Sequence, residues 1–409
     1  MNLLEKRVIN GVLNLIRARQ KTPLLREDDL RIHYTAVVAP ARLREALFSD
    51  YRAVTELKRR WGLIPDSFEN WERLWRHNPA RGQMQSERPI GWVLESEGKL
   101  VGYLGNISLL YRYAGRMLTA VTSSGLVVEP DYRAMTLSLV AAFYRQRSVD
   151  LYVATTAIEA VGKIARAFKS DPLPQPDYGT VLFWVLRSYP FAQALMEKLK
   201  LRPELSHISG MLASLAVGID KIARRRWPRL SSTRFAMSEI SVDEIGIDFQ
   251  ALWTEKLKEG LQLFADRSPA VLRWHFEIPG DRGTTRVLCC HHNGELLGYA
   301  VIRSDQSQTD GLRRSVIADL IAKRDDSEVF RALLVAAHDH AKCVGSHILE
   351  VLGFPESIRR VCSQWNPYSR KYPACPFYFK AADPMLHKAL SNGIAWYATP
   401  FDGDTTLMP

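Results

Sequence analysis

Short apolar runs alternate along the chain with stretches whose apolar residues recur every three or four positions. The first pattern is typical of buried strands and the second of amphipathic helices. In the first half we expect strands at Ile32–Val38, Gly91–Glu95, Leu100–Leu110, Met117–Val128, Leu151–Ala154 and Val181–Leu186, and helices at Ala41–Trp61, Ser67–His77, Tyr132–Arg147, Ala157–Lys169 and Phe191–Lys200. This order predicts an α/β fold built on an α+β mixed sheet with one crossover helix.

The second half repeats this order. Strands are expected at Phe235–Ile240, Thr285–His292, Leu296–Ser304, Arg313–Ala322, His347–Leu352, Tyr378–Ala381 and Gly393–Thr399, and helices at Phe249–Glu259, Pro269–Phe276, Ser327–Cys343 and Pro355–Ser363. The residues repeat as well, since GKLVGYLGNIS at Gly98–Ser108 is echoed by GELLGYAVIRS at Gly294–Ser304. A repeat of this length indicates duplicated domains. We expect a basic amphipathic helix over residues 1–30, domains over 31–206 and 234–409, and an interdomain helix and linker over 207–233.

Composition narrows the class of protein. The 409 residues carry a formal net charge of +11, which suits a polyphosphate ligand such as a nucleotide or coenzyme A. Nucleic acid is disfavoured, because the chain has no zinc spacing, helix-turn-helix signature or basic low-complexity tail. The five cysteines form no C-x-x-C pair, which is typical of reduced thiols in a cytoplasmic protein.

Two basic segments raise the question of membrane contact. No apolar run reaches the roughly 18 residues that span a bilayer, and the N-terminal segment lacks the pattern of a signal peptide. We expect its basic helix to pack on the first domain, with peripheral membrane contact as the minority alternative. The segment Ile208–Arg229 reads ISGMLASLAVGIDKIARRRWPR and leaves the same choice between an interdomain helix and contact with anionic lipid.

The most informative stretch is Pro89–Arg147. Three expected strands lead into a V-x-P-x-Y-R turn at Val128–Arg133, and a helix follows at once. The free N–H groups and the dipole at the start of a helix favour an anion, and Arg133 adds a positive charge. The turn therefore predicts an anion-binding site.

This element order, together with the turn, resembles the GNAT acyltransferase superfamily in two tandem copies that cover nearly the whole chain. In that family, amides of an R/Q-x-x-G-x-G/A turn after the fourth strand hold the coenzyme A pyrophosphate. The resemblance assigns acyl-CoA binding to Leu126, Val127, Val128, Arg133, Ala134, Met135, Thr136, Leu137 and Ser138, with Thr136 and Ser138 standing where glycines are usual. The matching turn of the second copy, Ala322–Ser327, carries two aspartates that would repel a pyrophosphate. We therefore expect the donor site in the first copy.

The resemblance also implies direct attack of an amine on a thioester. Such chemistry needs a base, a donor to the developing oxyanion and an acid for the leaving thiolate. The candidate catalytic residues are Thr122, Ser124, Thr155 and Glu350. The hydroxyl groups would face the cleft, or alternatively make local hydrogen bonds only. Lys163 and Ile164 occupy the region where the family's tyrosine acid is usual.

Glu350 stands in the apolar run HILEVLGF. Burying a carboxylate costs several kcal/mol unless it is paired. Glu350 is therefore either a base or acceptor ligand, or a core ion-pair partner. The histidine pairs of the second half lack a third ligand at useful spacing, so we expect no metal.

The sequence thus predicts an N-acyltransferase that moves an acetyl or longer acyl group from an acyl-CoA to an amine, such as an amino sugar or amino acid. One alternative is a FemAB-like transferase that uses aminoacyl-tRNA. Another is a catalytically inactive GNAT-like binding or scaffold protein. Hydrolase chemistry is disfavoured because no G-x-S-x-G motif is present.

Overall fold

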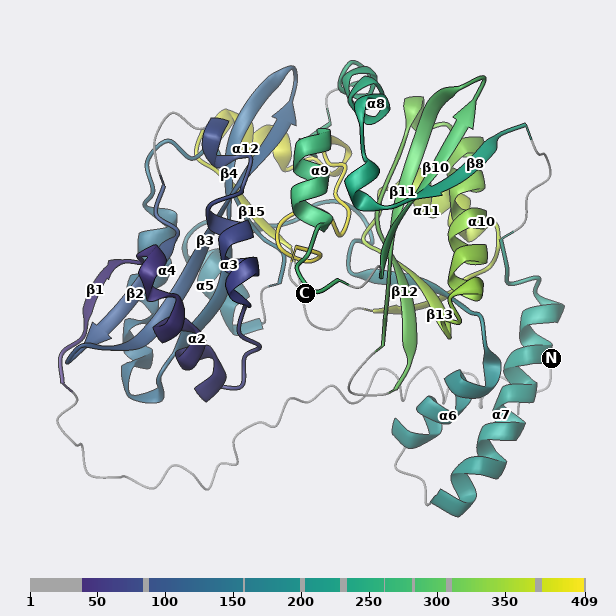
Figure 1. Cartoon of the computed structure of the whole chain (residues 1–409), viewed down its shortest axis with the longest axis horizontal. Helices are drawn as coiled ribbons and strands as arrows, with labels where there is room; N and C mark the ends of the chain where they lie inside the picture. The colour runs from purple at the N-terminus through teal and green to yellow at the C-terminus, as the bar shows by residue number, and fades with distance from the viewer. Residues whose placement is uncertain are drawn as a thin grey trace. The chain divides into compact units, whose positions relative to one another are not determined.

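The structure of the chain is a computed structural model (Figure 1) that describes residues 39–83, 88–156, 159–198, 203–228, 234–260, 262–281, 284–306, 311–371 and 377–407. The helix expected over residues 1–30 and the strand expected at Ile32–Val38 lie outside the described residues.

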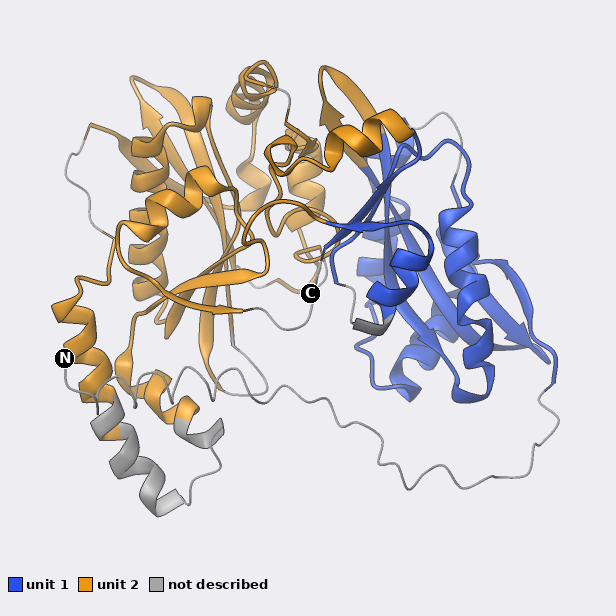
Figure 2. Ribbon diagram, turned by 180° about the vertical axis from the view of Figure 1, so that it is seen from behind, with its two compact units in different colours: residues 1–109, 119–172, 373–383 blue, residues 110–118, 173–372, 384–409 orange. Residues whose placement is uncertain are grey.

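The chain divides into two compact units (Figure 2). Unit 1 comprises residues 1–109, 119–172 and 373–383, and unit 2 comprises residues 110–118, 173–372 and 384–409. These limits differ from the expected domains, because strands from each half of the sequence belong to the other unit.

The sheet of unit 1 has the order β1-β2-β3-β4-β5-β15-β6. Its strands are β1 (Arg42–Glu45), β2 (Gly91–Ser96), β3 (Lys99–Tyr113), β4 (Arg116–Val128), β5 (Leu151–Ala154), β6 (Asp171–Pro172) and β15 (Tyr378–Ala381). Strands β4 and β5 pair in parallel, and β15 pairs antiparallel with β5. The far end of β3, which belongs to unit 2, pairs with β9 (Phe264–Ala265).

The sheet of unit 2 repeats this arrangement, with the order β8-β10-β11-β12-β13-β7-β14. Its strands are β7 (Thr180–Val185), β8 (Ala236–Ile240), β10 (Thr285–His292), β11 (Glu295–Gln306), β12 (Arg313–Ala322), β13 (Ile348–Leu352) and β14 (Tyr368–Lys371). Strand β7 follows the elements of unit 1 in the sequence, yet it pairs with β13 of unit 2. Strand β15 comes late in the sequence but pairs with β5 of unit 1. Each half of the sequence therefore contributes one strand to the sheet formed mainly by the other half.

Helices pack on both faces of the unit 1 sheet. They are α2 (Tyr51–Arg60), α3 (Phe68–Trp75), α4 (Thr136–Tyr144) and α5 (Glu159–Ala167). Helix α4 packs its Phe143 in a core cluster with Leu104, whereas Trp71 of α3 lies 6.3 Å from the Tyr103 ring. Consecutive residues of a strand point to opposite faces, so α3 and α4 lie on opposite sides of β3.

The described helices of unit 2 are α6 (Ser188–Lys198), α7 (Pro203–Ala223), α8 (Ile247–Leu257), α9 (Pro269–Phe276), α10 (Ser327–Cys343), α11 (Glu356–Ser363) and α12 (Pro384–Leu390). Most of the inward face of α10 is fully buried. Helix α7, which was expected as an interdomain helix, packs Val217 against Phe183, Val185 and Ile348 of unit 2.

Three expectations about local structure were wrong. The chain forms strand β1 where the start of the helix Ala41–Trp61 was expected, and Asp50 accepts a hydrogen bond from the Leu47 N–H before α2 begins at Tyr51. The strand expected at Gly393–Thr399 is a short 3₁₀ helix at Gly393–Ala395, with the Asn392 side chain accepting from the Ile394 N–H. Residues 171–179, where neither a strand nor a helix was expected, contain β6, which borders β15.

Candidate functional site

Strands β4 and β5 of unit 1 separate after a short parallel pairing. Three residue pairs join them, the last being Thr122 and Val153. Strand β4 then continues to Val128 with no β5 partner among the described residues. We call this opening beside Ser123–Val128 the unit 1 wedge. Unpaired backbone groups along such an edge can hydrogen-bond an extended ligand.

Two of the predicted hydroxyl residues lie where the wedge begins. Thr122 is the last β4 residue that pairs with β5, and Thr155 comes directly after β5. Both are buried, and the Thr122 Oγ1 has no hydrogen-bond partner within the described part of the chain. Leaving a buried hydroxyl unpaired costs about 1–3 kcal/mol. This atom therefore suits a position that a polar ligand atom completes. Ser124 is also buried, two residues further along β4.

The predicted anion turn opens into a 3₁₀ helix, Pro130–Met135, before α4 starts at Thr136. The sequence predicted free N–H groups at the start of this helix. The Thr136 N–H instead donates to the Arg133 carbonyl, so this amide is not free. Arg133, Ala134 and Leu137 are exposed, whereas Met135, Thr136 and Ser138 are half-buried. The turn is held by Tyr132, whose hydroxyl donates to Ser96 Oγ over 3.0 Å. It therefore presents the Arg133 side chain to solvent beside the end of β4.

A buried lysine that the sequence reasoning missed lies beside the wedge. Lys58 of α2 forms an ion pair of 2.6 Å with Asp66, and both side chains are almost fully buried. Its ammonium lies 5.5 Å from the centre of the Tyr103 ring. Gly125 of β4 has φ +66°, and a Cβ added there would stand 3.1 Å from Lys58 Nζ. Lys58 therefore places a positive charge against the backbone of the free part of β4.

The network around Lys58 is continued by α3. Asp66 also accepts from Asn70 Nδ2 over 2.8 Å, and Asn70 Oδ1 accepts from Arg73 Nε over 3.0 Å. Burial, together with the charges of Asp66 and Asp50, raises the pKa of Tyr103 well above its ordinary value. The Tyr103 phenol therefore stays protonated at neutral pH.

A tyrosine of the exchanged strand β15 lies against α5, the helix that follows β5 and carries Lys163 and Ile164. Tyr378 of β15 is buried against Ala154 and Ala165. Its hydroxyl lies 2.6 Å from where a Cβ at Gly162 of α5 would stand. A larger residue at position 162 would collide with this ring. No local signal in the sequence connects Tyr378 to α5, because more than 200 residues separate them.

Strands β12 and β13 of unit 2 also separate, after Ile317 and Val351. Here the corresponding opening is filled by the protein itself. Asp319 on the free part of β12 accepts from Arg267 Nε at 3.0 Å, from Tyr299 Oη at 2.9 Å and from Thr399 Oγ1 at 2.9 Å. Arg267 also pairs with Asp402 at 3.5 Å. Asp319 stands three residues before the end of its strand, as Gly125 does in β4.

The backbone of β12 is occupied as well. The Tyr397 hydroxyl donates to the Leu320 carbonyl over 2.8 Å, and Lys256 Nζ donates to the Ala322 carbonyl over 3.1 Å. In the following turn, the Arg324 N–H donates to Glu259 Oε1 and the Glu328 N–H donates to Asp326 Oδ1. The carboxylates of Glu259 and Asp326 thus take two amides of this turn, whereas Asp325 pairs with Lys256 at 2.7 Å.

Glu350 lies on β13 of unit 2, whereas Thr122, Ser124 and Thr155 belong to unit 1. Its Oε1 is 2.9 Å from Arg370 Nη2 and 3.9 Å from Arg314 Nε. These contacts favour the interpretation of Glu350 as an ion-pair partner over its interpretation as a catalytic base.

Among the described residues, no group of three or more His, Cys, Asp or Glu side chains could hold a metal ion. No described helix is long and apolar enough to cross a bilayer.

No protein-family model matches the chain, and no curated protein sequence is similar to it. Solved structures are similar in fold. A GCN5-related N-acetyltransferase from Anabaena variabilis shares 11% identity over 84% of this chain and 73% of its own, with a TM-score of 0.53. One from Kribbella flavida shares 12% identity over 86% and 73%, with a TM-score of 0.52. Eis1 from Mycobacterium abscessus shares 15% identity over 86% and 76%, with a TM-score of 0.50.

These similarities, together with the two sheets of like order, show that the chain has the GNAT fold in tandem form.

Proposed function

We propose that the protein transfers an acyl group from an acyl-CoA to an amine, and that unit 1 carries the reaction. The observation that supports this is the contrast between the two wedges. The wedge of unit 1 is bordered by an unpaired buried hydroxyl and a glycine, whereas the equivalent opening of unit 2 is filled by Arg267, Asp319 and their partners.

In this proposal the donor lies along the free part of β4. The backbone of Leu126, Val127 and Val128 would pair with the pantetheine arm, and Arg133 would contact the phosphates. The turn Ala134–Ser138 would contribute its remaining amides, with dipole support from α4. Since the side chains of Thr136 and Ser138 are only half-buried, they leave the turn accessible.

The reaction joins the amine nitrogen to the thioester carbonyl carbon and breaks the carbon–sulfur bond. Negative charge develops on the carbonyl oxygen and then on the departing sulfur, while the amine passes its proton to water. Lys58, held by Asp66 against Gly125, would stabilise the charge on the oxygen. Thr122, Ser124 and Thr155 would contact the reacting groups through their hydroxyls.

Tyr378 would donate a proton to the leaving thiolate. Its hydroxyl lies against α5, where the resemblance to GNAT enzymes places such a group. Tyr378→Phe removes only the hydroxyl oxygen, so we expect kcat to fall by about 10²-fold or more while donor affinity is unchanged. Equal kcat in the two proteins would remove Tyr378 from the mechanism.

The test of the proposal is calorimetric titration with acetyl-CoA and with a longer acyl-CoA. Arg133→Glu should weaken binding at least about tenfold, because it places a negative charge beside the phosphates. Arg145→Glu is the matched control, since Arg145 is an exposed arginine at the other end of α4. Equal affinity of the wild type and Arg133→Glu for the donor would show that Arg133 does not contact its phosphates. No binding up to millimolar donor would refute the proposed function.

A further inference from the structure

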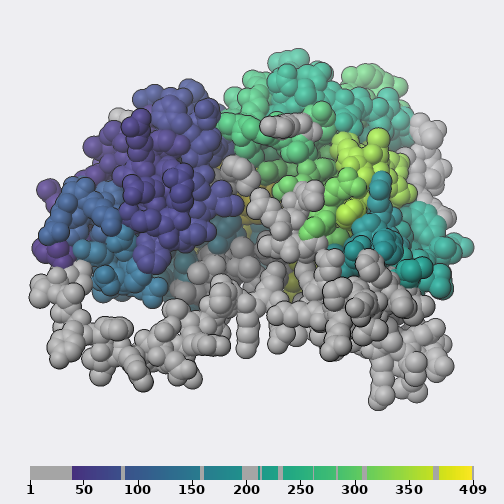
Figure 3. Space-filling model, turned by 60° about the horizontal axis from the view of Figure 1, so that its bottom comes forward, coloured from purple at the N-terminus to yellow at the C-terminus, as the bar shows by residue number. Residues whose placement is uncertain are grey.

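Helix α7 presents an apolar stripe to the outside. Met211, Leu215, Ile219 and Ile222 are 64%, 62%, 59% and 71% exposed. Their spacing of four, four and three residues places them along one side of the helix. Figure 3 shows teal atoms, the colour of this part of the sequence, on the surface of the molecule. Contiguous exposed apolar residues of this kind mark an interaction surface.

The side of α7 that packs on unit 2 carries charged residues as well as the apolar Val217. Asp220 accepts from the Tyr368 hydroxyl over 2.6 Å, and Lys221 Nζ donates to the Leu186 carbonyl over 3.4 Å. A surface helix of a globular protein normally buries its apolar side and exposes its polar side. Helix α7 instead exposes its apolar stripe and turns Asp220 and Lys221 toward unit 2. Its outer side is therefore suited to an apolar environment.

Cationic side chains gather near α7. A Cβ added at Gly345 would stand 3.2 Å from Arg187 Nη2 and 3.3 Å from Arg313 Nη2, so the two guanidinium groups converge there. Arg187, Arg313 and Lys342 are exposed. Burial, together with the nearby charge of Lys342, lowers the pKa of Lys221. The surroundings of the helix are therefore positively charged.

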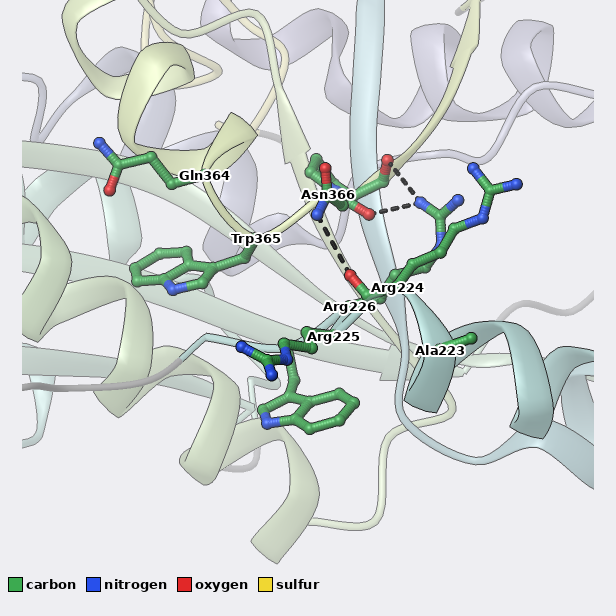
Figure 4. Close-up of a pocket in the computed structure, with 9 residues that line it drawn as sticks. Ala223, Arg224, Arg225, Arg226, Gln364, Trp365 and Asn366 are labelled. Carbon is green, nitrogen blue, oxygen red and sulfur yellow. Dashed lines mark hydrogen bonds between the residues drawn. The ribbon is translucent and has the colours of Figure 1, made fainter.

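The C-terminal end of α7 borders a cavity of about 670 Å³, lined by Arg224–Trp227 on one side and Gln364–Pro367 on the other (Figure 4). Arg226 is fixed, because it donates to the carbonyls of Asn366 and Pro367. Arg225 is exposed and forms no ion pair within the described part of the chain. An available arginine beside two indole rings is the composition that the headgroup region of a bilayer favours.

We propose that α7 docks in the plane of an anionic lipid bilayer. The stripe Met211–Leu215–Ile219–Ile222 enters the boundary between headgroups and acyl chains, and Arg225 and the cations near Gly345 contact the anionic headgroups. This proposal is independent of the acyl transfer proposed for unit 1.

The test is flotation of the full chain with phosphatidylcholine vesicles, with and without phosphatidylglycerol. We expect binding to the anionic vesicles that weakens as the salt rises from about 0.1 M to 1 M, because salt screens the headgroup charge. Leu215→Glu with Ile219→Glu should lower the partition coefficient at least about tenfold. The control is Ile247→Glu with Ile394→Glu, since these isoleucines are 80% and 79% exposed on other elements of unit 2.

A second pair of variants tests whether the positive charge of Arg225 contributes to binding of anionic lipid. Arg225→Glu should weaken binding to anionic vesicles more than Lys388→Glu, which changes an exposed cation on α12. Failure of the wild type to float with anionic vesicles would overturn the proposal. So would an equal loss in the stripe variant and its isoleucine control. A fall in the mass measured by light scattering for the stripe variant, from dimer to monomer, would show that a second copy covers the stripe, and would overturn it too.

Discussion

Removal of the Asp66 carboxylate tests how the polar network beside the wedge is held together. In Asp66→Ala, the Lys58 side chain loses a carboxylate partner at 2.6 Å, in surroundings where both side chains are no more than 7% exposed. Breaking such a buried pair costs about 3–5 kcal/mol. The Tyr103 ring offers the ammonium up to about 2 kcal/mol in compensation, while Asn70 Nδ2 loses its acceptor. We therefore expect unit 1 to lose about 3 kcal/mol or more.

The assay is hydrogen exchange of peptides from α2 and α3 across a urea titration, which reports on unit 1 without assuming that both units unfold together. Glu56→Ala is the control on the same helix, because its ion pair with Arg60 is exposed and should contribute less than about 1 kcal/mol. In the double variant Lys58→Met with Asp66→Ala, neither charge of the pair remains, so the loss should shrink to about 1–3 kcal/mol. A loss below about 1 kcal/mol in Asp66→Ala, or a double variant less stable than the single one, would refute the reasoning.

Three further predictions follow from the buried groups. Gly125→Val should destabilise unit 1 by about 1–3 kcal/mol in the same assay, because valine is strained at φ +66° and its Cβ meets Lys58; unchanged stability would contradict this. Asp319→Ala should destabilise unit 2 by about 3–5 kcal/mol, since Arg267 is fully buried, and unaltered exchange in β12 would be the contrary result. Burial, with a smaller contribution from the charge of Asp319, raises the pKa of Asp402 to about 6, so folding favours its protonated form. The free energy of unfolding should therefore fall by about 3 kcal/mol between pH 4 and 6, and Asp402→Asn should abolish that part of the pH dependence.

Most of the fold could be predicted from the sequence because the apolar pattern is regular. The ranges expected for β5, α9, β10, β12 and α10 agree with the structure to the residue. Strand β1 was missed because its four residues RLRE show little alternation and are followed by a helical pattern. The exchange of β7 and β15 could not be predicted, since hydrophobic pattern determines that a strand forms but not which sheet it joins.

The site was only partly predictable. The strand and turn residues follow from local motifs, and the structure places Thr122 and Thr155 where β4 and β5 separate. Lys58 was not found, because a lysine in a helix rich in charged residues gives no sign that its ammonium is buried. One signal was available in the repeat, since Lys58 and Lys256 each lie in the helix before the serine that precedes α3 or α9.

The strand exchange has a consequence for synthesis of the protein on the ribosome. The sheet of unit 1 needs β15, which emerges roughly 220 residues after β5. At about 5–20 residues per second, the edge of β5 stays unpaired for roughly 10–45 s. An unpaired apolar strand edge is a site of aggregation. The nascent first half would therefore depend on a chaperone, or on slow association of its β5 edge with other chains, until β15 is synthesised. For the same reason, a gene cut between α7 and β8 should yield two fragments that fold only when they are produced together.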